Sequence, residues 1–142
     1  MNTEHNIEVA KNYLKAVGNR DVEAVAELMT EDATWWIIPG TKFSGDYKIK
    51  DFLAGMPAFF DLATGDFEFE ILQVLAQDDQ VAIVAKGNMP LKSGANYNSD
   101  YSFFFTFRDG KILSGHEYLD GVLVNKIFGA PGTDDSAGAG RR

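Results

Sequence analysis

The hydrophobic periodicity of the chain changes near Thr64-Gly65, and this change constrains the fold more than any other feature of the sequence. Before this point, apolar residues recur every three or four positions, as on one face of a helix. After it, they alternate with a period of two, as in strands that bury one face. Helices followed by strands with short turns predict an α+β fold with a mostly antiparallel sheet.

The first half of the chain predicts three helices and one strand. Asp21 is expected to cap the second helix with its side chain. Pro57 lacks a backbone donor and is expected to bend or interrupt the third helix. The expected elements are helices over residues 5–18 and 22–29, a strand over 33–38 and a helix from about Asp46.

The second half predicts four strands and a final helix. Asp109-Gly110 is a strong hairpin signal, because this dipeptide accepts the positive φ values of a tight turn. Asp120 is placed to cap the final helix. The expected elements are strands near 67–76, 79–89, 97–108 and 111–119, and a helix from Gly121 to Phe128.

One predicted strand is apolar on both faces. Phe103, Phe105 and Phe107 share one face, and Phe104 lies on the other. The helices can cover only one face of the sheet, and a half-solvated sheet alternates more cleanly. We therefore expect a homodimer formed through the outer face of the sheet.

Composition and charge narrow the functional classes. The 142 residues are 45% hydrophobic and 13% aromatic, which is typical of one globular domain, expected over residues 1–128 with a flexible tail over 129–142. The absence of cysteine excludes disulfides and thiolate metal sites. A net charge of −8 disfavours nucleic acid and anionic lipid as partners. With neither a membrane span nor a secretion signal in the sequence, we expect a cytoplasmic protein.

Short motifs spread over residues 7–128 together resemble one superfamily. They are Tyr13 and Asp21, the segments 32–40 and 43–45, Tyr97-Asn98 with Tyr101, and the segments 109–112 and 117–120. Their order and spacing resemble the SnoaL-like branch of the nuclear-transport-factor-like superfamily, which includes ketosteroid isomerase, polyketide cyclases and limonene-epoxide hydrolase. The resemblance implies a cone-shaped, curved sheet around three N-terminal helices, with a hydrophobic pocket at one end that binds a small hydrophobic molecule.

The resemblance also implies which residues face the pocket. Glu117, Tyr13 and Tyr101 are the expected polar groups, with Gly115 beside Glu117. The expected ligand-binding residues are Trp36, Ile37, Phe60, Phe103, Phe105, Leu113 and Leu119.

The chain departs from ketosteroid isomerase at two acidic positions. The general-base aspartate of that enzyme falls near Ile37, and its second aspartate falls near Phe103. Neither side chain here can transfer a proton. The resemblance therefore disfavours that isomerase mechanism, although the oxyanion-hole tyrosine has a counterpart in Tyr13.

Glu117 is the principal catalytic candidate. Its strand face is otherwise apolar, so desolvation is expected to raise its pKa toward that of a general acid or base. The alternative is a carboxylate at the solvent-exposed rim. Asp120 is a further acid/base candidate, because polyketide cyclases of this superfamily use an aspartate near the end of the sheet. His116 is expected on the opposite face from Glu117.

Tyr13 and Tyr101 are candidate hydrogen-bond donors to a carbonyl oxygen, and the alternative for either is a core tyrosine bonded to the backbone. No metal, nucleotide or other cofactor site is expected, because the glycine-spaced segment 40–45 lacks the P-loop lysine and segment 116–120 lacks a second histidine. Two functions stay open. One is a cofactor-free isomerase, cyclase, dehydratase or hydratase acting on a small carbonyl compound, and the other is a non-catalytic ligand-binding or dimerisation module.

Overall fold

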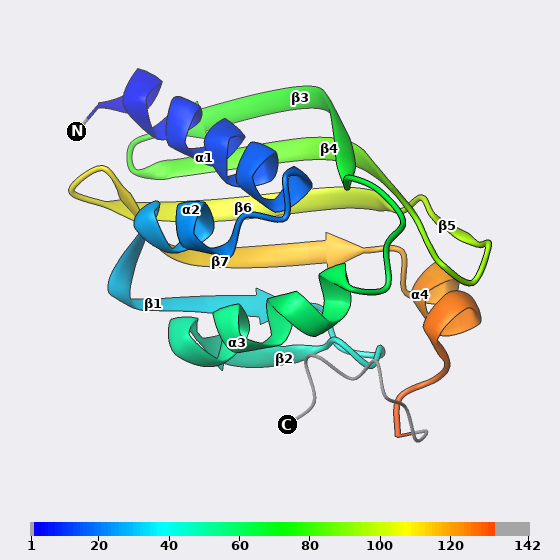
Figure 1. Cartoon of the computed structure of the whole chain (residues 1–142). Coiled ribbons are helices and arrows are strands. Elements are labelled where there is room, and N and C mark those ends of the chain that lie inside the picture. Colours follow the sequence, from blue (N-terminus) through cyan, green and yellow to red (C-terminus); the bar gives the residue numbers. More distant parts are fainter. Residues whose placement is uncertain (1, 133–142) are drawn as a thin grey trace.

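A computed structural model of the chain describes residues 2–132. Over this range it has four helices and a seven-stranded, mostly antiparallel sheet, which confirms the predicted α+β fold (Figure 1). Residues 133–142 of the predicted tail lie outside the described residues. In chain order the elements are α1 (Thr3–Gly18), α2 (Val22–Glu27), β1 (Met29–Ile37), β2 (Gly45–Lys48), α3 (Ile49–Phe60), β3 (Glu68–Gln77), β4 (Gln80–Pro90), β5 (Asn96–Tyr97), β6 (Asp100–Arg108), β7 (Lys111–Leu119) and α4 (Gly121–Phe128).

The sheet is curved and does not close into a barrel. Its strand order is β2-β1-β7-β6-β4-β3, with β5 paired to β4. Strands β1 and β7 run parallel, and the other pairs are antiparallel. Helices α1, α2 and α3 cover one face, and α4 lies beside β5 at one end (Figure 1). The main core lies between those three helices and the concave face of the sheet.

Two helix caps and one tight turn that the sequence predicted are present at the ends of these elements. The side chain of Asp21 accepts a 3.1 Å hydrogen bond from the backbone N–H of Ala24 and caps α2. The side chain of Asp120 caps α4 in the same way, by accepting from Leu123. Asp109 and Gly110 both have positive φ, at 52° and 81°, as the predicted tight turn requires.

Several boundaries differ from the sequence prediction. The second helix, expected over 22–29, ends at Glu27, and the strand expected over 33–38 already begins at Met29. Residues 45–48 form the edge strand β2 against β1, so the third helix begins at Ile49 and not at Asp46. Helix α3 continues through Pro57, which therefore does not interrupt it. The predicted strand over 97–108 is divided into β5 and β6, with the buried Ser99 between them.

The outer face of the sheet carries exposed apolar side chains. Phe104 is 41% exposed, whereas its neighbours Phe103 and Phe105 are buried, as the alternation predicted. Leu72 and Leu75 on β3 and Tyr118 on β7 are also exposed. No helix among residues 2–132 covers this face. The homodimer stays a prediction.

In the part of the chain that the structure describes, no helix is both long and apolar enough to span a membrane.

Candidate functional site

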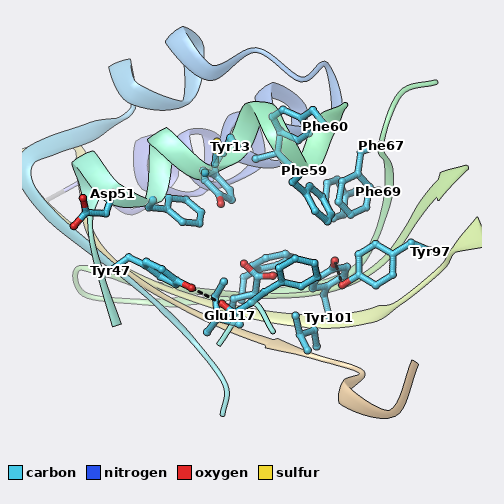
Figure 2. Close-up of a pocket in the computed structure, with 18 residues that line it drawn as sticks. Tyr13, Tyr47, Asp51, Phe59, Phe60, Phe67, Phe69, Tyr97, Tyr101 and Glu117 are labelled. Atoms are coloured by element: carbon cyan, nitrogen blue, oxygen red, sulfur yellow. Dashed lines mark hydrogen bonds between the residues drawn. The ribbon is translucent and has the colours of Figure 1, made fainter. Parts of the chain in front are cut away.

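A cavity of about 100 Å³ lies between the helices and the concave face of the sheet (Figure 2). Most of its lining residues are aromatic, and Figure 2 draws them as sticks. Helix α3 supplies more lining residues than any other element, and the others come from α1, from strands of the sheet and from the segments between elements. The lining residues are Tyr13, Val17, Ile37, Phe43, Tyr47, Asp51, Phe52, Gly55, Met56, Phe59, Phe60, Phe67, Phe69, Tyr97, Tyr101, Phe103, Glu117 and Leu119.

Glu117 reaches the cavity from β7, where its carboxyl is held by Trp35. The indole Nε1 of Trp35 donates a 2.9 Å hydrogen bond to Glu117 Oε1. Trp35 lies opposite Gly115 in the parallel pair of β1 and β7. A Cβ atom on Gly115 would come within 2.0 Å of the Trp35 ring, so only glycine leaves room for the indole there. Trp35 is itself fully buried.

The surroundings of Glu117 change its acidity. The residue is half-buried by accessible area, because the cavity reaches it, yet protein encloses its carboxyl. This burial raises the pKa of Glu117 to about 7, and the hydrogen bond from Trp35 acts in the opposite direction by stabilising the carboxylate. The predicted rise of the pKa is confirmed. The carboxyl can therefore both accept and donate a proton near neutral pH.

Three tyrosine hydroxyls accompany this carboxyl. Tyr13 on α1 points its hydroxyl into the cavity (Figure 2). Tyr101 donates a 2.8 Å hydrogen bond to the hydroxyl of Tyr97. Burial, together with the nearby charge of Glu117, raises the pKa of all three tyrosines. They stay protonated at neutral pH and can act as hydrogen-bond donors.

Tyr13 differs from Tyr101 in what its hydroxyl contacts. No hydrogen bond joins the Tyr13 hydroxyl to another residue within 2–132, so its proton is available to a ligand. The ring of Tyr13 stacks on Trp35, with centroids 4.8 Å apart. Trp35 thereby contacts two of the polar groups proposed from the sequence, Tyr13 and Glu117.

Seven of the predicted site residues lie together around the cavity. They are Tyr13, Ile37, Phe60, Tyr101, Phe103, Glu117 and Leu119. Ile37 and Phe103 occupy the positions that resemble the two acidic positions of ketosteroid isomerase. Because both line the cavity as apolar side chains, Glu117 is its only deeply placed carboxyl among the described residues.

Four predicted site residues do not line the cavity. Trp36 lies on the outer face beside His116 and Tyr118, at ring-centroid distances of 5.2 and 5.3 Å, because the alternation of β1 turns Trp35 inward instead. Phe105 is completely buried behind the cavity wall and packs edge-on against Tyr13 and Trp35.

The other two are Leu113 and Asp120. An irregularity in the pairing of β6 with β7 leaves Leu113 as an extra residue, which places Ile112 on the buried face instead. Asp120 is exposed, and its side chain caps α4. The position of His116 on the face opposite Glu117 is confirmed.

Sequence reasoning missed several residues of the site. Trp35 and Trp36 are adjacent on a strand, so one of them was expected to face the pocket, and the sequence favoured Trp36. Tyr97 was identified only as part of a family motif. Phe52, Met56 and Phe59 on α3 could have been predicted as lining residues, because their spacing of four and three residues places them on one face of the helix. The contribution of Phe69 depends on how the edge strand β3 pairs with β4, and Phe67, just before β3, is positioned by a backbone hydrogen bond to Gly18.

The electrostatics of the lining are acidic. Asp51 and Glu117 line the cavity, and the described residues place no Lys, Arg or His there. Figure 2 shows Asp51 at one end of the cavity, and its side chain is exposed. No cluster of three His, Asp or Glu side chains able to hold a metal ion occurs within residues 2–132.

The chain is similar in sequence to one protein family and in structure to several solved proteins. The sequence profile of the SnoaL-like domain matches residues 10–115. No curated protein matches the chain.

Three solved structures illustrate the structural likeness. A protein assigned as a SnoaL-like polyketide cyclase from Jannaschia sp. CCS1 is 17% identical, with a TM-score of 0.75 over 91% of this chain and 94% of that chain. An LEH-like epoxide hydrolase from M. tuberculosis is 16% identical, with a TM-score of 0.71 over 87% and 89%. TerC, co-crystallised with polyporic acid, is 23% identical, with a TM-score of 0.73 over 87% and 97%. At these identities the likeness shows the shared fold alone.

Proposed function

The chain belongs to the SnoaL-like domain family, and we propose that it is a cofactor-independent enzyme that moves protons on a small, largely apolar carbonyl compound. The observation that carries this proposal is a single carboxyl, Glu117, set deep in an aromatic cavity beside a free tyrosine hydroxyl. Isomerisation, cyclisation and dehydration share this step, since each begins with removal of a proton next to a carbonyl. Structural neighbours that include an assigned polyketide cyclase and an LEH-like epoxide hydrolase support small-molecule chemistry in this fold.

In the proposed step, Glu117 in its carboxylate form removes a proton from the carbon next to the carbonyl. The C–H bond breaks, the proton joins a carboxylate oxygen, and the electron pair forms an enolate. Tyr13 donates a hydrogen bond to the enolate oxygen, where negative charge develops. Glu117 then returns the proton to carbon at the same or another position. Trp35 holds one carboxylate oxygen, which leaves the other for the substrate.

The experiment measures proton exchange without requiring the natural substrate. The protein is incubated with cyclohexanone in D₂O at pD 7, and loss of the α-proton signal is followed by ¹H NMR. We expect wild type to exceed the buffer rate and Glu117→Gln to lose the excess. Tyr13→Phe is expected to lower the excess rate about 10²–10³-fold, as for loss of an oxyanion donor. Glu68→Gln on the exposed edge strand β3 is the matched control and should behave as wild type.

The proposal fails if wild type exchanges no faster than buffer while the ketone binds. That outcome supports the second candidate, a non-catalytic binding module of the same fold. The observation that favours the second candidate is the replacement of both ketosteroid isomerase acidic positions by Ile37 and Phe103, which leaves fewer proton-transfer groups in the cavity. Equal exchange by wild type and Glu117→Gln would show instead that another group is the base.

We also propose that two copies of the chain associate through the outer face of the sheet. The exposed Phe104, Leu75 and Tyr118, together with the half-buried Trp36, support this arrangement. Contiguous exposed apolar surface of this kind marks interaction sites in soluble proteins. The arrangement leaves the cavity, on the opposite side of the sheet, free for the ligand.

A further inference from the structure

The volume of the cavity limits the size of its ligand. At about 100 Å³ it is smaller than the engineered apolar cavity of roughly 150 Å³ that accommodates benzene. A single six-membered ring therefore occupies the available space after modest side-chain adjustment. Two fused rings exceed this volume and would either extend out of the cavity or displace a wall.

The walls resist such displacement because their rings are packed against one another. Phe67 stacks on Phe69 with centroids 4.4 Å apart, and Tyr101 stacks on Phe103 at 5.0 Å. Densely packed aromatic walls adjust by small shifts and not by large displacements.

The C-terminal helix supports one wall of the cavity from behind. Phe128 on α4 packs against the lining residues Phe59 at 6.0 Å and Tyr97 at 5.3 Å. Phe59 lines the cavity, whereas Phe128 does not. A shorter side chain at Phe59 would therefore enlarge the cavity toward α4.

The charges of the lining select against anionic ligands. Two carboxyl groups, those of Glu117 and Asp51, line the cavity, and no basic side chain in the described part of the chain does so. Lys42 is buried next to the lining residue Phe43 but does not line the cavity itself. An anion placed there would be desolvated with no positive partner, and the net charge of −8 adds to the repulsion.

The buried polar groups that line the cavity are the carboxyl of Glu117 and the hydroxyls of Tyr13, Tyr97 and Tyr101, whereas Asp51 lies exposed at one end. The hydroxyl of Tyr101 is engaged with that of Tyr97. Phe52, Phe60 and Phe69 add apolar surface to the lining. The hydroxyl of Tyr47, a further lining residue, donates to the backbone oxygen of Phe43 and so is already engaged. The geometry matches a ligand with one hydrogen-bond acceptor and an apolar remainder.

On the basis of the proposed function, we propose that the substrate of this site is a ketone or enone with a single ring and no negative charge. Fused-ring ketones and ring ketones that carry a carboxylate are excluded, the first by Phe59 and the stacked walls, the second by the acidic lining. This cavity therefore accepts a smaller and less polar compound than a wider cavity in the same fold would accept.

The test compares binding of three related ketones to wild type by saturation-transfer NMR at pH 8, where Glu117 is charged. The ligands are 4-methylcyclohexanone, 2-decalone and 4-oxocyclohexanecarboxylate. We expect 4-methylcyclohexanone to bind at least tenfold more tightly than each of the other two. Equal or tighter binding of 2-decalone would overturn the size limit. Equal or tighter binding of 4-oxocyclohexanecarboxylate would overturn the exclusion of anions.

Variants of Phe59 test the cause of the size limit. Phe59→Ala lengthens the cavity and is expected to bring the affinity for 2-decalone to within threefold of that for 4-methylcyclohexanone. Phe59→Leu is a milder enlargement in case the alanine variant does not fold, and it should shift the ratio in the same direction. An unchanged ratio in a folded variant would overturn the role of Phe59. If the binding order holds but no proton exchange occurs, catalysis is disproved while the ligand class stands.

Discussion

The indole of Trp35 and the carboxyl of Glu117, 82 residues apart in the chain, are joined by a 2.9 Å hydrogen bond at the wall of the cavity. Trp35 is held between two other rings, stacked on Tyr13 at 4.8 Å and on Phe52 at 5.1 Å. The indole therefore has little freedom to move, and the carboxylate that it binds is fixed in direction. Gly115 makes this arrangement possible by leaving the space that the ring occupies.

The first prediction concerns Gly115→Ala. The added methyl group would lie 2.0 Å from the Trp35 ring, so the indole must be displaced. We expect the free energy of unfolding to fall by about 3 kcal/mol, at the upper end of typical overpacking costs, and the hydrogen bond to Glu117 to be lost. Urea denaturation measures the first effect, and the ¹H–¹⁵N signal of the Trp35 indole reports the second. Gly65→Ala, where the new methyl group would lie 3.9 Å from Pro90, is the control and should be nearly neutral.

The second prediction concerns the acidity of Glu117 in Trp35→Phe. Removal of the indole donor takes away the one contribution that lowers this pKa, so the pKa should rise above its wild-type value of about 7. Titration of ¹³C-labelled glutamate by NMR measures the shift directly. Trp36→Phe changes the neighbouring ring on the outer face and should leave the titration unchanged. An unchanged pKa in a folded Trp35→Phe variant would show that the hydrogen bond does not stabilise the carboxylate.

A third prediction links Glu117 to the pH dependence of stability. Burial raises its pKa from 4.5 to about 7, so between these pH values the folded protein holds a proton that the unfolded chain has released. The free energy of unfolding therefore falls as the pH rises through this window, by about 3 kcal/mol, and the stabilisation is fully present below pH 4.5.

The measurement compares wild type with Glu117→Gln by urea denaturation from pH 4 to pH 8. The other carboxyls titrate alike in both proteins, so the difference between the two curves isolates Glu117. We expect the stability of wild type relative to the variant to decline across the window and to level off above pH 7. Parallel curves would contradict the raised pKa.

The last prediction tests the outer face of the sheet. Wild type should sediment as a dimer at micromolar concentration, and Phe104→Lys should shift it to monomer by placing a charge in the proposed interface. Val122→Lys on α4 introduces the same charge at a position that is 81% exposed and away from this face, so it should stay dimeric. A monomeric wild type would remove the dimer proposal without affecting the cavity.

The sequence predicted most elements because their signals are local. The change in periodicity located the helices and the strands, the Asp109-Gly110 turn formed with both residues at positive φ, and Asp21 and Asp120 became helix caps. The edge strand β2 was missed because four residues are too few to display a period. Pro57 was expected to bend or interrupt α3, but the helix continues through it because packing against the sheet outweighs one lost hydrogen bond.

Some features of the site likewise follow from the local sequence, and others depend on contacts between distant residues. Alternation along one strand determines that Trp35 and Trp36 face opposite sides, and that Glu117 and His116 do so too. It does not determine which of the two tryptophans faces inward, because that depends on the pairing of β1 with β7. The extra residue Leu113 likewise changes which residues of β7 face the core, and the neighbouring residues do not predict this irregularity.

The sequence by itself determined the fold class, most element boundaries and the candidacy of Glu117, because periodicity and turn chemistry act between neighbouring residues. Only the tertiary structure decided that Trp35 binds Glu117, that the Tyr97 hydroxyl accepts a hydrogen bond from Tyr101, and that aromatic rings leave a cavity of about 100 Å³. These properties arise from contacts between residues far apart in the chain, and the volume that remains depends on how every wall packs. The same packing fixes the acidity of Glu117, since burial and not its neighbours in the chain moves its pKa.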